Sequence, residues 1–186
     1  GHILLMNKKN NSELVYNDLN EVDYLGRVYQ EYHFKSTTGT NESSVNSDET
    51  TIVHHDVIEL PNHNLLATVS DGSKYIEDTM VEISYKTGKI VKVIDLKKIL
   101  PQEMYTQYSS TKRSDGKIDW FHQNSIEYDT SDNSIIISGR HQDMIMKIDY
   151  KTNKIKWIYS GKKDWPDEYK QYLLTPTLNT SITGGQ

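Results

Sequence analysis

Short runs in which apolar and polar residues alternate fill most of the chain, and turn residues separate these runs. Residues 54–60 read H-H-D-V-I-E-L, and residues 122–128 read H-Q-N-S-I-E-Y. A turn follows each run, P-N-H-N in the first case and T-S-D-N in the second, and then comes a second apolar run, L-L-A-T-V-S or S-I-I-I-S-G. Alternation with a period of two is typical of β-strands. The pattern therefore predicts pairs of antiparallel strands.

Two further segments have nearly the same sequence and predict a second hairpin in each unit. Residues 85–90 read Y-K-T-G-K-I and residues 150–155 read Y-K-T-N-K-I, at an offset of 65 (150 − 85). Gly or Asn stands where a tight turn needs a positive φ, and apolar runs lie on both sides. The runs that begin at 54 and 122 have a similar offset of 68 (122 − 54), so a unit of four short strands repeats. A weaker copy of the hairpin, V-D-Y-L-G-R-V-Y, occupies residues 22–29.

Repeated four-stranded units without helical patterns between them are typical of a β-propeller. We therefore predict an all-β propeller fold, of which this chain supplies two full blades and part of another. The expected segments are a partial blade at 1–35, a polar loop at 36–51, a blade at 52–95, an insertion loop at 96–119, a blade at 120–160 and a connection into a further blade at 161–186. Because open blade edges are exposed pairing surfaces, we expect the chain to be part of a larger domain.

Composition narrows the classes of function. The net charge of −5 argues against a general nucleic-acid surface, which needs clustered positive charge. The absence of cysteine excludes disulfides, thiolate nucleophiles and Cys-ligated metals. The longest apolar runs are too short to span a bilayer. No signal peptide is visible, but Gly1-His2 is interpreted as a cloning scar or an internal cut, so this says little about secretion.

Two histidines are the first candidate site residues. His54 and His122 occupy equivalent positions at the start of the innermost strand of successive units, and these starts converge on the central channel of a propeller. His-x-Asp in one unit becomes His-x-Asn in the next, so Asp56 matches Asn124. Alternation along the strand turns His55 the other way. The alternative interpretation is that these residues only cap turns and strand ends.

Arg140 adds an anion-binding group to this prediction. It lies in S-G-R-H-Q-D at the end of the second strand of its blade, and antiparallel pairing should bring it close to His122. A guanidinium group binds tetrahedral oxyanions with two parallel hydrogen bonds. The alternative is a surface arginine that pairs with an acid such as Asp143. By strand alternation, His141 should face away from Arg140 and be structural.

These residues lie in motifs that resemble the arylsulfate sulfotransferase family. The resemblance rests on D-W-F-H-Q-N-S-I-E-Y-D followed by S-I-I-I-S-G-R-H-Q, on the earlier H-H-D-V-I-E-L-P-N-H-N-L-L-A, and on W-I-Y-S-G-K-K-D-W-P-D-E-Y-K-Q-Y-L-L-T-P. It covers nearly the whole chain from about Leu14 onward. The combination of the H-x-N-S-I and S-x-R-H-Q motifs, with Arg140 at an offset of 18 from His122 (140 − 122), is specific.

The resemblance implies a six-bladed propeller that transfers a sulfuryl group from an aryl sulfate ester to a phenol. The family uses no nucleotide sulfate donor (PAPS) and works through a sulfohistidine. On the matching positions, His54, His122 and Arg140 would be the catalytic and substrate-binding residues, with Asn124 and Asp56 behind them. No cofactor, metal, nucleic acid or membrane partner is implied. The expected compartment lies outside the cytoplasm, periplasmic or secreted, and the oligomeric state stays open, with a homodimer as one option.

The chain departs from the family pattern at its last residues. The sulfurylated histidine of the family lies in the blade after the arginine strand, in a motif that reads roughly Gly-Gln-His, and this chain reads T-G-G-Q at 183–186. The internal repeat gives the same position, because the repeat offset, counted from His122, places the next histidine near 187–190. We therefore expect the nucleophile just beyond Gln186 and expect this chain alone to be inactive.

Three other interpretations are open. Channel histidines can bind a divalent metal ion, although Asn is a weak ligand and Arg140 would repel a cation. The propeller could be non-catalytic and bind a ligand or a protein, which predicts no channel histidine in the further blade. It could also be a hydrolase in which water replaces the phenol, and product analysis with and without phenol separates hydrolysis from transfer.

Overall fold

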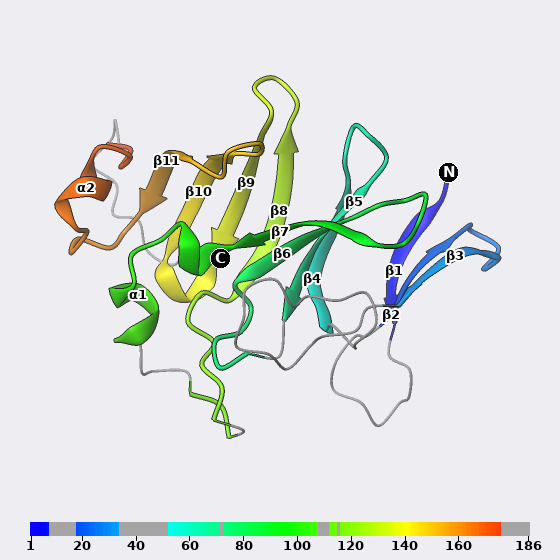
Figure 1. Ribbon diagram of the computed structural model, residues 1–186, viewed down its shortest axis with the longest axis horizontal. Coiled ribbons are helices and arrows are strands. Elements are labelled where there is room, and N and C mark those ends of the chain that lie inside the picture. The colour runs from blue at the N-terminus through cyan, green and yellow to red at the C-terminus, as the bar shows by residue number, and fades with distance from the viewer. Residues whose placement is uncertain (8–17, 34–51, 71–72, 108–111, 115, 176–186) are drawn as a thin grey trace. The chain divides into compact units, whose positions relative to one another are not determined.

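The computed structural model describes residues 1–7, 18–33, 52–70, 73–107, 112–114 and 116–175. The described residues form three antiparallel β-sheets with short helical turns between them (Figure 1), which confirms the all-β prediction. The polar loop predicted at 36–51 lies outside the described residues, as do parts of the insertion loop and of the final connection. The chain divides into two compact units, Gly1–Lys74 with Thr79–Val93 and Tyr75–Asp78 with Ile94–Gln186, and each is described by itself.

The first unit contains a three-stranded sheet in the order β1-β2-β3. Its strands are β1 (Ile3–Asn7), β2 (Asp18–Val22) and β3 (Val28–His33). The β2–β3 turn is closed by Asp23, whose Oδ1 accepts hydrogen bonds from the backbone N–H groups of Leu25 (2.9 Å) and Arg27 (3.0 Å). This hairpin is the weak copy that the sequence predicts at residues 22–29.

The second sheet has its strands in chain order, β4-β5-β6-β7, which is the arrangement of a propeller blade. Its strands are β4 (Ile52–Glu59), β5 (Leu65–Ser70), β6 (Thr79–Ile83) and β7 (Ile90–Asp95). Between β6 and β7 the predicted Y-K-T-G-K-I turn is present. Gly88 has a φ of +67° there, and its N–H donates to the carbonyl of Ser84 (2.8 Å).

The core of the first unit lies between these two sheets. Leu19 and Tyr32 from the first sheet pack in one cluster with residues of the second sheet, and all are at most 3% exposed. The second-sheet members of this cluster are Val53, Leu65, Ala67, Val69, Val81 and Ile83. Burying one such aliphatic side chain contributes about 1.5–3 kcal/mol. The alternating apolar positions therefore hold the two sheets together.

The second unit contains the third sheet, in the order β11-β10-β9-β8 (Figure 1). Its strands are β8 (Gln123–Asp129), β9 (Ser134–Gly139), β10 (Met144–Asp149) and β11 (Ile155–Ser160). The short helical turns are η1 (Leu96–Lys98), α1 (Glu103–Thr106), η2 (Arg140–Gln142) and α2 (Asp167–Lys170). Asn153 takes the positive φ (57°) in the β10–β11 turn, as the Y-K-T-N-K-I repeat predicts. This sheet again has its strands in chain order, as a blade does.

Candidate functional site

His122 immediately precedes β8 and has a left-handed backbone, with a φ of 53°. A non-glycine residue takes this conformation only where its surroundings hold it there. Two backbone hydrogen bonds do so. The Arg140 N–H donates to the His122 carbonyl (3.1 Å), and the Gln123 N–H donates to the Glu77 carbonyl (3.1 Å). The start of β8 is therefore fixed both to the end of β9 and to the segment that contains Glu77.

Two carboxylates face the same ring nitrogen of His122. Its Nδ1 lies 2.5 Å from Asp119 Oδ2 and 2.8 Å from Glu77 Oε2. The three side chains are only 17%, 10% and 14% exposed. One N–H group makes one well-directed hydrogen bond, so Asp119 is the acceptor and Glu77 adds a second negative charge.

This environment determines the charge of His122. The hydrogen bond to Asp119, and after it the interaction with Glu77, raise the pKa of His122 to about 9, while burial opposes the rise. At neutral pH the ring is therefore an imidazolium, and both of its nitrogens carry protons. An imidazolium is a hydrogen-bond donor and a general acid, and it has no lone pair with which to attack sulfur.

His141 lies against the same group. Its Nδ1–H donates to the backbone carbonyl of Asp119 (2.8 Å), and its ring centroid is 4.7 Å from that of His122. The sequence predicts Arg140 at the end of the strand, with alternation turning His141 away from it, but residues 140–142 form the 3₁₀ turn η2. Strand alternation therefore does not place His141, and this residue belongs to the site.

Arg140 follows β9 directly and is exposed. Because its N–H donates to the His122 carbonyl, the two side chains start from neighbouring backbone positions, as expected from antiparallel pairing. Asp143 ends the turn in a left-handed conformation (φ 46°), and its N–H donates to the Arg140 carbonyl (3.3 Å). The second unit thus presents a cationic imidazole and a guanidinium group from adjacent chain segments.

Large buried rings support this part of the site. Trp120 and Phe121 are fully buried, with ring centroids 5.4 Å apart. A Cβ added to Gly139 would lie only 2.5 Å from Phe121 Cζ, so the ring packs directly on the glycine backbone. Trp120 Nε1 donates to Asp78 Oδ2 (2.6 Å), which also accepts from Lys97 Nζ (3.0 Å). The residues on either side of the histidine site are therefore anchored in the core.

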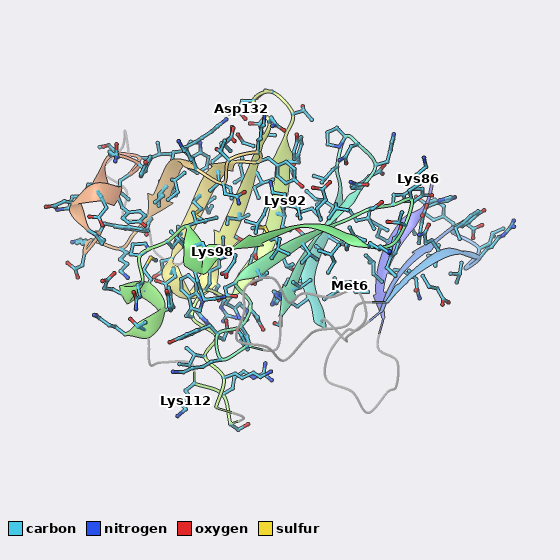
Figure 2. The ribbon with its side chains drawn as sticks, viewed as in Figure 1. Met6, Lys86, Lys92, Lys98, Lys112 and Asp132 are labelled. Atoms are coloured by element: carbon cyan, nitrogen blue, oxygen red, sulfur yellow. The ribbon has the colours of Figure 1, made fainter. Side chains whose placement is uncertain are left out.

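The opposite end of the same hairpin is a solvated charge cluster. Asp132 lies in the β8–β9 turn (Figure 2). Its Oδ2 is 3.0 Å from Lys147 Nζ and 3.0 Å from Lys156 Nζ. The pair of Asp132 and Lys156 is the more exposed of the two, and exposed pairs contribute little to stability. It provides a control for substitutions at the buried charges.

His54 lies in β4 of the first unit and is 8% exposed. The β4–β5 register shifts between Val53 and Val57, and Thr68 Oγ1 compensates by donating to the His54 carbonyl. The Asp56 N–H in turn donates to Thr68 Oγ1 (3.2 Å), and Asp56 Oδ1 accepts from the Val57 N–H (2.9 Å). Asp56 thus caps a local irregularity of the strand.

The backbone conformation makes a different pair of histidines equivalent from the pair that the sequence repeat aligns. Both inner strands are irregular near a left-handed histidine, but this residue is His55 (φ 54°) in β4 and His122 (φ 53°) before β8. The repeat pairs His122 with His54. The extra residue in β8 is Asn124, which is half-buried. Because His54 and His122 belong to different units, their convergence stays a prediction.

The cluster of Asp119, His122 and His141 could alternatively bind a metal ion. Ligand-capable atoms of Asp119, His122 and His141 lie within 4.8 Å of one another. The Nδ1 atoms of both histidines already face oxygens of Asp119, and the raised pKa of His122 opposes the loss of a proton that ligation needs. We therefore assign the cluster to hydrogen bonding around a cation. In the part of the chain that the structure describes, no helix is long and apolar enough to cross a membrane.

Comparisons with known proteins agree with the motifs around this site. The family model described as Arylsulfotransferase (ASST) matches residues 1–186. The arylsulfate sulfotransferase AssT of Escherichia coli O6:H1 is 30% identical over 160 residues, which cover 66% of this chain and 26% of that protein. The AssT of Lelliottia amnigena is 29% identical over 160 residues, with the same two shares. The chain therefore spans about a quarter of the length of these curated relatives.

Proposed function

Because this chain belongs to the arylsulfotransferase family, we propose that it is part of an enzyme that transfers a sulfuryl group from an aryl sulfate ester to a phenol. Both relatives are named arylsulfate sulfotransferase, which supports this activity. The observation that carries the proposal is the pair of cationic groups on adjacent backbone segments, the imidazolium of His122 and the guanidinium of Arg140. Such a pair suits a sulfate ester, because its sulfuryl oxygens share a negative charge and further negative charge develops on the aryl oxygen as the ester bond breaks.

His122 and Arg140 bind oxygens of the sulfate ester in this proposal. Preorganised donors at these oxygens stabilise the transition state without reorganising during the reaction. The nucleophile is a neutral histidine, which splits one difficult transfer into two easier ones through a sulfohistidine. From the repeat spacing we place it just beyond Gln186, so the chain of residues 1–186 is expected to be inactive alone.

His54 is proposed as the third residue that contacts the sulfuryl group. Its support is the sequence repeat together with its burial at 8% exposure in the inner strand β4. We propose that Asn124 and Asp56 support these residues without contacting the substrate. The capping hydrogen bonds of Asp56 fit a role in shaping the backbone around His54. Aryl sulfate and phenol are the only partners that the proposal requires, and the compartment that it favours lies outside the cytoplasm.

The test is an assay of the full-length protein with p-nitrophenyl sulfate, with and without an added phenol, followed by identification of the products. We expect nitrophenol release that depends on the phenol and appears with an equal amount of the new aryl sulfate. Arg140→Ala and His122→Ala should each lower kcat roughly 10²- to 10³-fold, the usual loss for one donor to a developing oxyanion.

Arg113→Ala is the matched control, because it removes another exposed arginine of the same unit. It should leave the rate unchanged. If inorganic sulfate is the product in the presence of phenol, the reaction is hydrolysis and not transfer. If no aryl sulfate of a panel releases its phenol, the protein is better explained as a ligand- or protein-binding propeller.

A further inference from the structure

We propose that Asp119 is a positioning residue that, together with Glu77, fixes the ring of His122 so that its Nε2–H protonates the departing phenoxide. This inference rests on the proposed function and deepens it. It assigns His122 the part of the general acid and excludes it as the nucleophile. Asp119 and Glu77 act through His122 and do not themselves contact the substrate.

The first support is the way in which Glu77 is held beside His122. Two adjacent residues of the segment Tyr75–Asp78 are hydrogen-bonded to the two ends of the stretch 118–123. The Ile76 N–H donates to the Ile118 carbonyl (3.0 Å), and the Gln123 N–H donates to the Glu77 carbonyl (3.1 Å). The Glu77 carboxylate thus starts from a backbone position fixed directly opposite the histidine.

The second support is that Asp119 is fixed independently of His122. Its carbonyl accepts the Nδ1–H of His141 (2.8 Å), and the next carbonyl, that of Trp120, accepts the side-chain amide of Gln142 (2.6 Å). Trp120 is also bonded to Asp78, the neighbour of Glu77 (2.6 Å). Both carboxylates therefore belong to one cross-linked group, and the ring of His122 is oriented by it.

The orientation decides which nitrogen can react. With Nδ1–H directed at Asp119, a contact between His122 and a substrate must be made through Nε2. The same logic applies wherever a carboxylate on one nitrogen of an imidazole sets the tautomer and stabilises the imidazolium form. A water-excluded position strengthens this effect, and the three side chains are less than one-fifth exposed.

Two bonds change at sulfur in the first half of the reaction. A ring nitrogen of the nucleophilic histidine forms a bond to sulfur while the bond from sulfur to the aryl oxygen breaks. The aryl oxygen takes the electron pair of that bond and the Nε2 proton of His122, so a neutral phenol leaves and His122 becomes neutral. In the second half, the acceptor phenol gives its proton to Nε2 as its oxygen attacks sulfur. The N–S bond then breaks and the nucleophilic histidine regains its electron pair.

Within the described part of the chain, three titratable side chains face His122: Asp119 from its own segment, Glu77 from the segment Tyr75–Asp78, and His141 from η2. Arg140, also from η2, is joined to His122 through its backbone N–H. The two carboxylates favour the imidazolium and raise its pKa to about 9. An acid that must be protonated works below its pKa, so loss of Asp119 should move the alkaline limb of the rate profile to lower pH.

The experiment compares Asp119→Asn with the wild-type full-length protein on a series of aryl sulfates whose leaving phenols differ in acidity. We expect kcat to fall roughly 10- to 100-fold at pH 8, within the range of general acid catalysis. The loss should be larger for weakly acidic phenols, which need protonation, than for p-nitrophenol. Glu127→Gln is the control. It removes an exposed carboxylate from strand β8, which follows Asp119 in the chain, and it should change neither kcat nor the pH profile.

An equal loss for every leaving group, with an unmoved alkaline limb, would overturn the proposal and leave Asp119 with a structural role. Nitrogen NMR of ¹⁵N-histidine-labelled protein, with His122 assigned from His122→Gln, tests the orientation without any turnover. Two protonated nitrogens at pH 7.5 in the wild type, and titration at a lower pH in Asp119→Asn, are expected. A neutral His122 at pH 7.5 would overturn the positioning role even if transfer occurs. If the protein shows no sulfuryl transfer but gives the expected spectra, the proposed function and the acid role of His122 are wrong. The positioning of its ring by Asp119 then still stands.

Discussion

At the scale of single residues, the Nδ1 atom of His122 lies close to two carboxylates, at 2.5 Å from Asp119 and 2.8 Å from Glu77. Repeat spacing finds His122, because His54 stands at the equivalent position of the other blade, and antiparallel pairing places Arg140 beside His122. Asp119 is visible shortly before His122 in D-W-F-H, but nothing in the sequence pairs it with that ring. Glu77 belongs to no motif, since its role depends on a segment far away in the chain. The charge of the histidine therefore could be learned only from the structure.

Gly139 shows how a residue without a side chain supports the site. Its φ of −122° is accessible to any residue, so Gly139→Ala would cause no backbone strain. The added Cβ would, however, meet three atoms of the Phe121 ring at 2.5–2.8 Å. We expect Gly139→Ala to lower the free energy of unfolding by about 1–3 kcal/mol, the usual cost of overpacking. Chemical denaturation of the full-length protein measures this.

A second substitution tests the cause of that loss. Phe121→Leu shortens the group that the new methyl meets, so the double variant should lose less stability than the sum of the two single variants. Strict additivity would mean that Phe121 is not the residue responsible. A gain of stability in Gly139→Ala alone, as at unstrained glycines, would mean that the close packing of this ring is wrong.

At the scale of elements, the period-two runs and the Gly and Asn turns predicted the hairpins because these features are local. Gly88 and Asn153 occupy the left-handed turn positions that the two copies of the Y-K-T repeat imply. The 3₁₀ turn of residues 140–142 was not predicted, since S-G-R-H-Q-D reads equally well as a strand end. The register shifts near the starts of β4 and β8 could not be predicted from the alternating pattern either, although they change the backbone beside the histidines.

The link between the Tyr75–Asp78 segment and η1 is a buried charge network. Asp78, whose side chain is 1% exposed, accepts from Lys97 Nζ at 3.0 Å, and Lys97 also lies 2.9 Å from Asp95. Burial raises the pKa of Asp78 above its ordinary value, although Lys97 and the Trp120 hydrogen bond act in the opposite direction. The pair thus keeps a charge in the core that would otherwise be strongly unfavourable.

Lys97→Met should therefore destabilise the protein by about 3–5 kcal/mol at neutral pH, because it leaves a buried carboxylate without its cation. Loss of the solvated pair in Lys156→Met should cost about 0–1 kcal/mol. The loss in Lys97→Met should shrink as the pH falls, since Asp78 can then be protonated, and Asp78→Asn should recover part of it. Thermal unfolding between pH 5 and 8 measures both effects. Equal costs for the two lysine variants would contradict the role of the network.

At the scale of the whole molecule, the described residues form two four-stranded sheets with strands in chain order and a three-stranded one, and the segment matched to the curated relatives covers 26% of their length. The family could be named from the sequence because the H-x-N-S-I and S-x-R-H-Q motifs combine at one spacing. The proposed meeting of His54 with His122 and Arg140 would depend on how blades are arranged around a channel. Such an arrangement cannot be read from a repeat.

The central claim is that His122 donates a proton and binds the sulfuryl group while a different histidine carries it. The most direct measurement is to mix the full-length protein with an aryl sulfate in the absence of phenol, and to locate the bound sulfuryl group by peptide mass spectrometry. We predict about one sulfuryl group per protein, on a histidine beyond residue 186, with none on His122 and labelling roughly 10²- to 10³-fold slower in Arg140→Ala. A sulfuryl group on His122 itself would contradict the account.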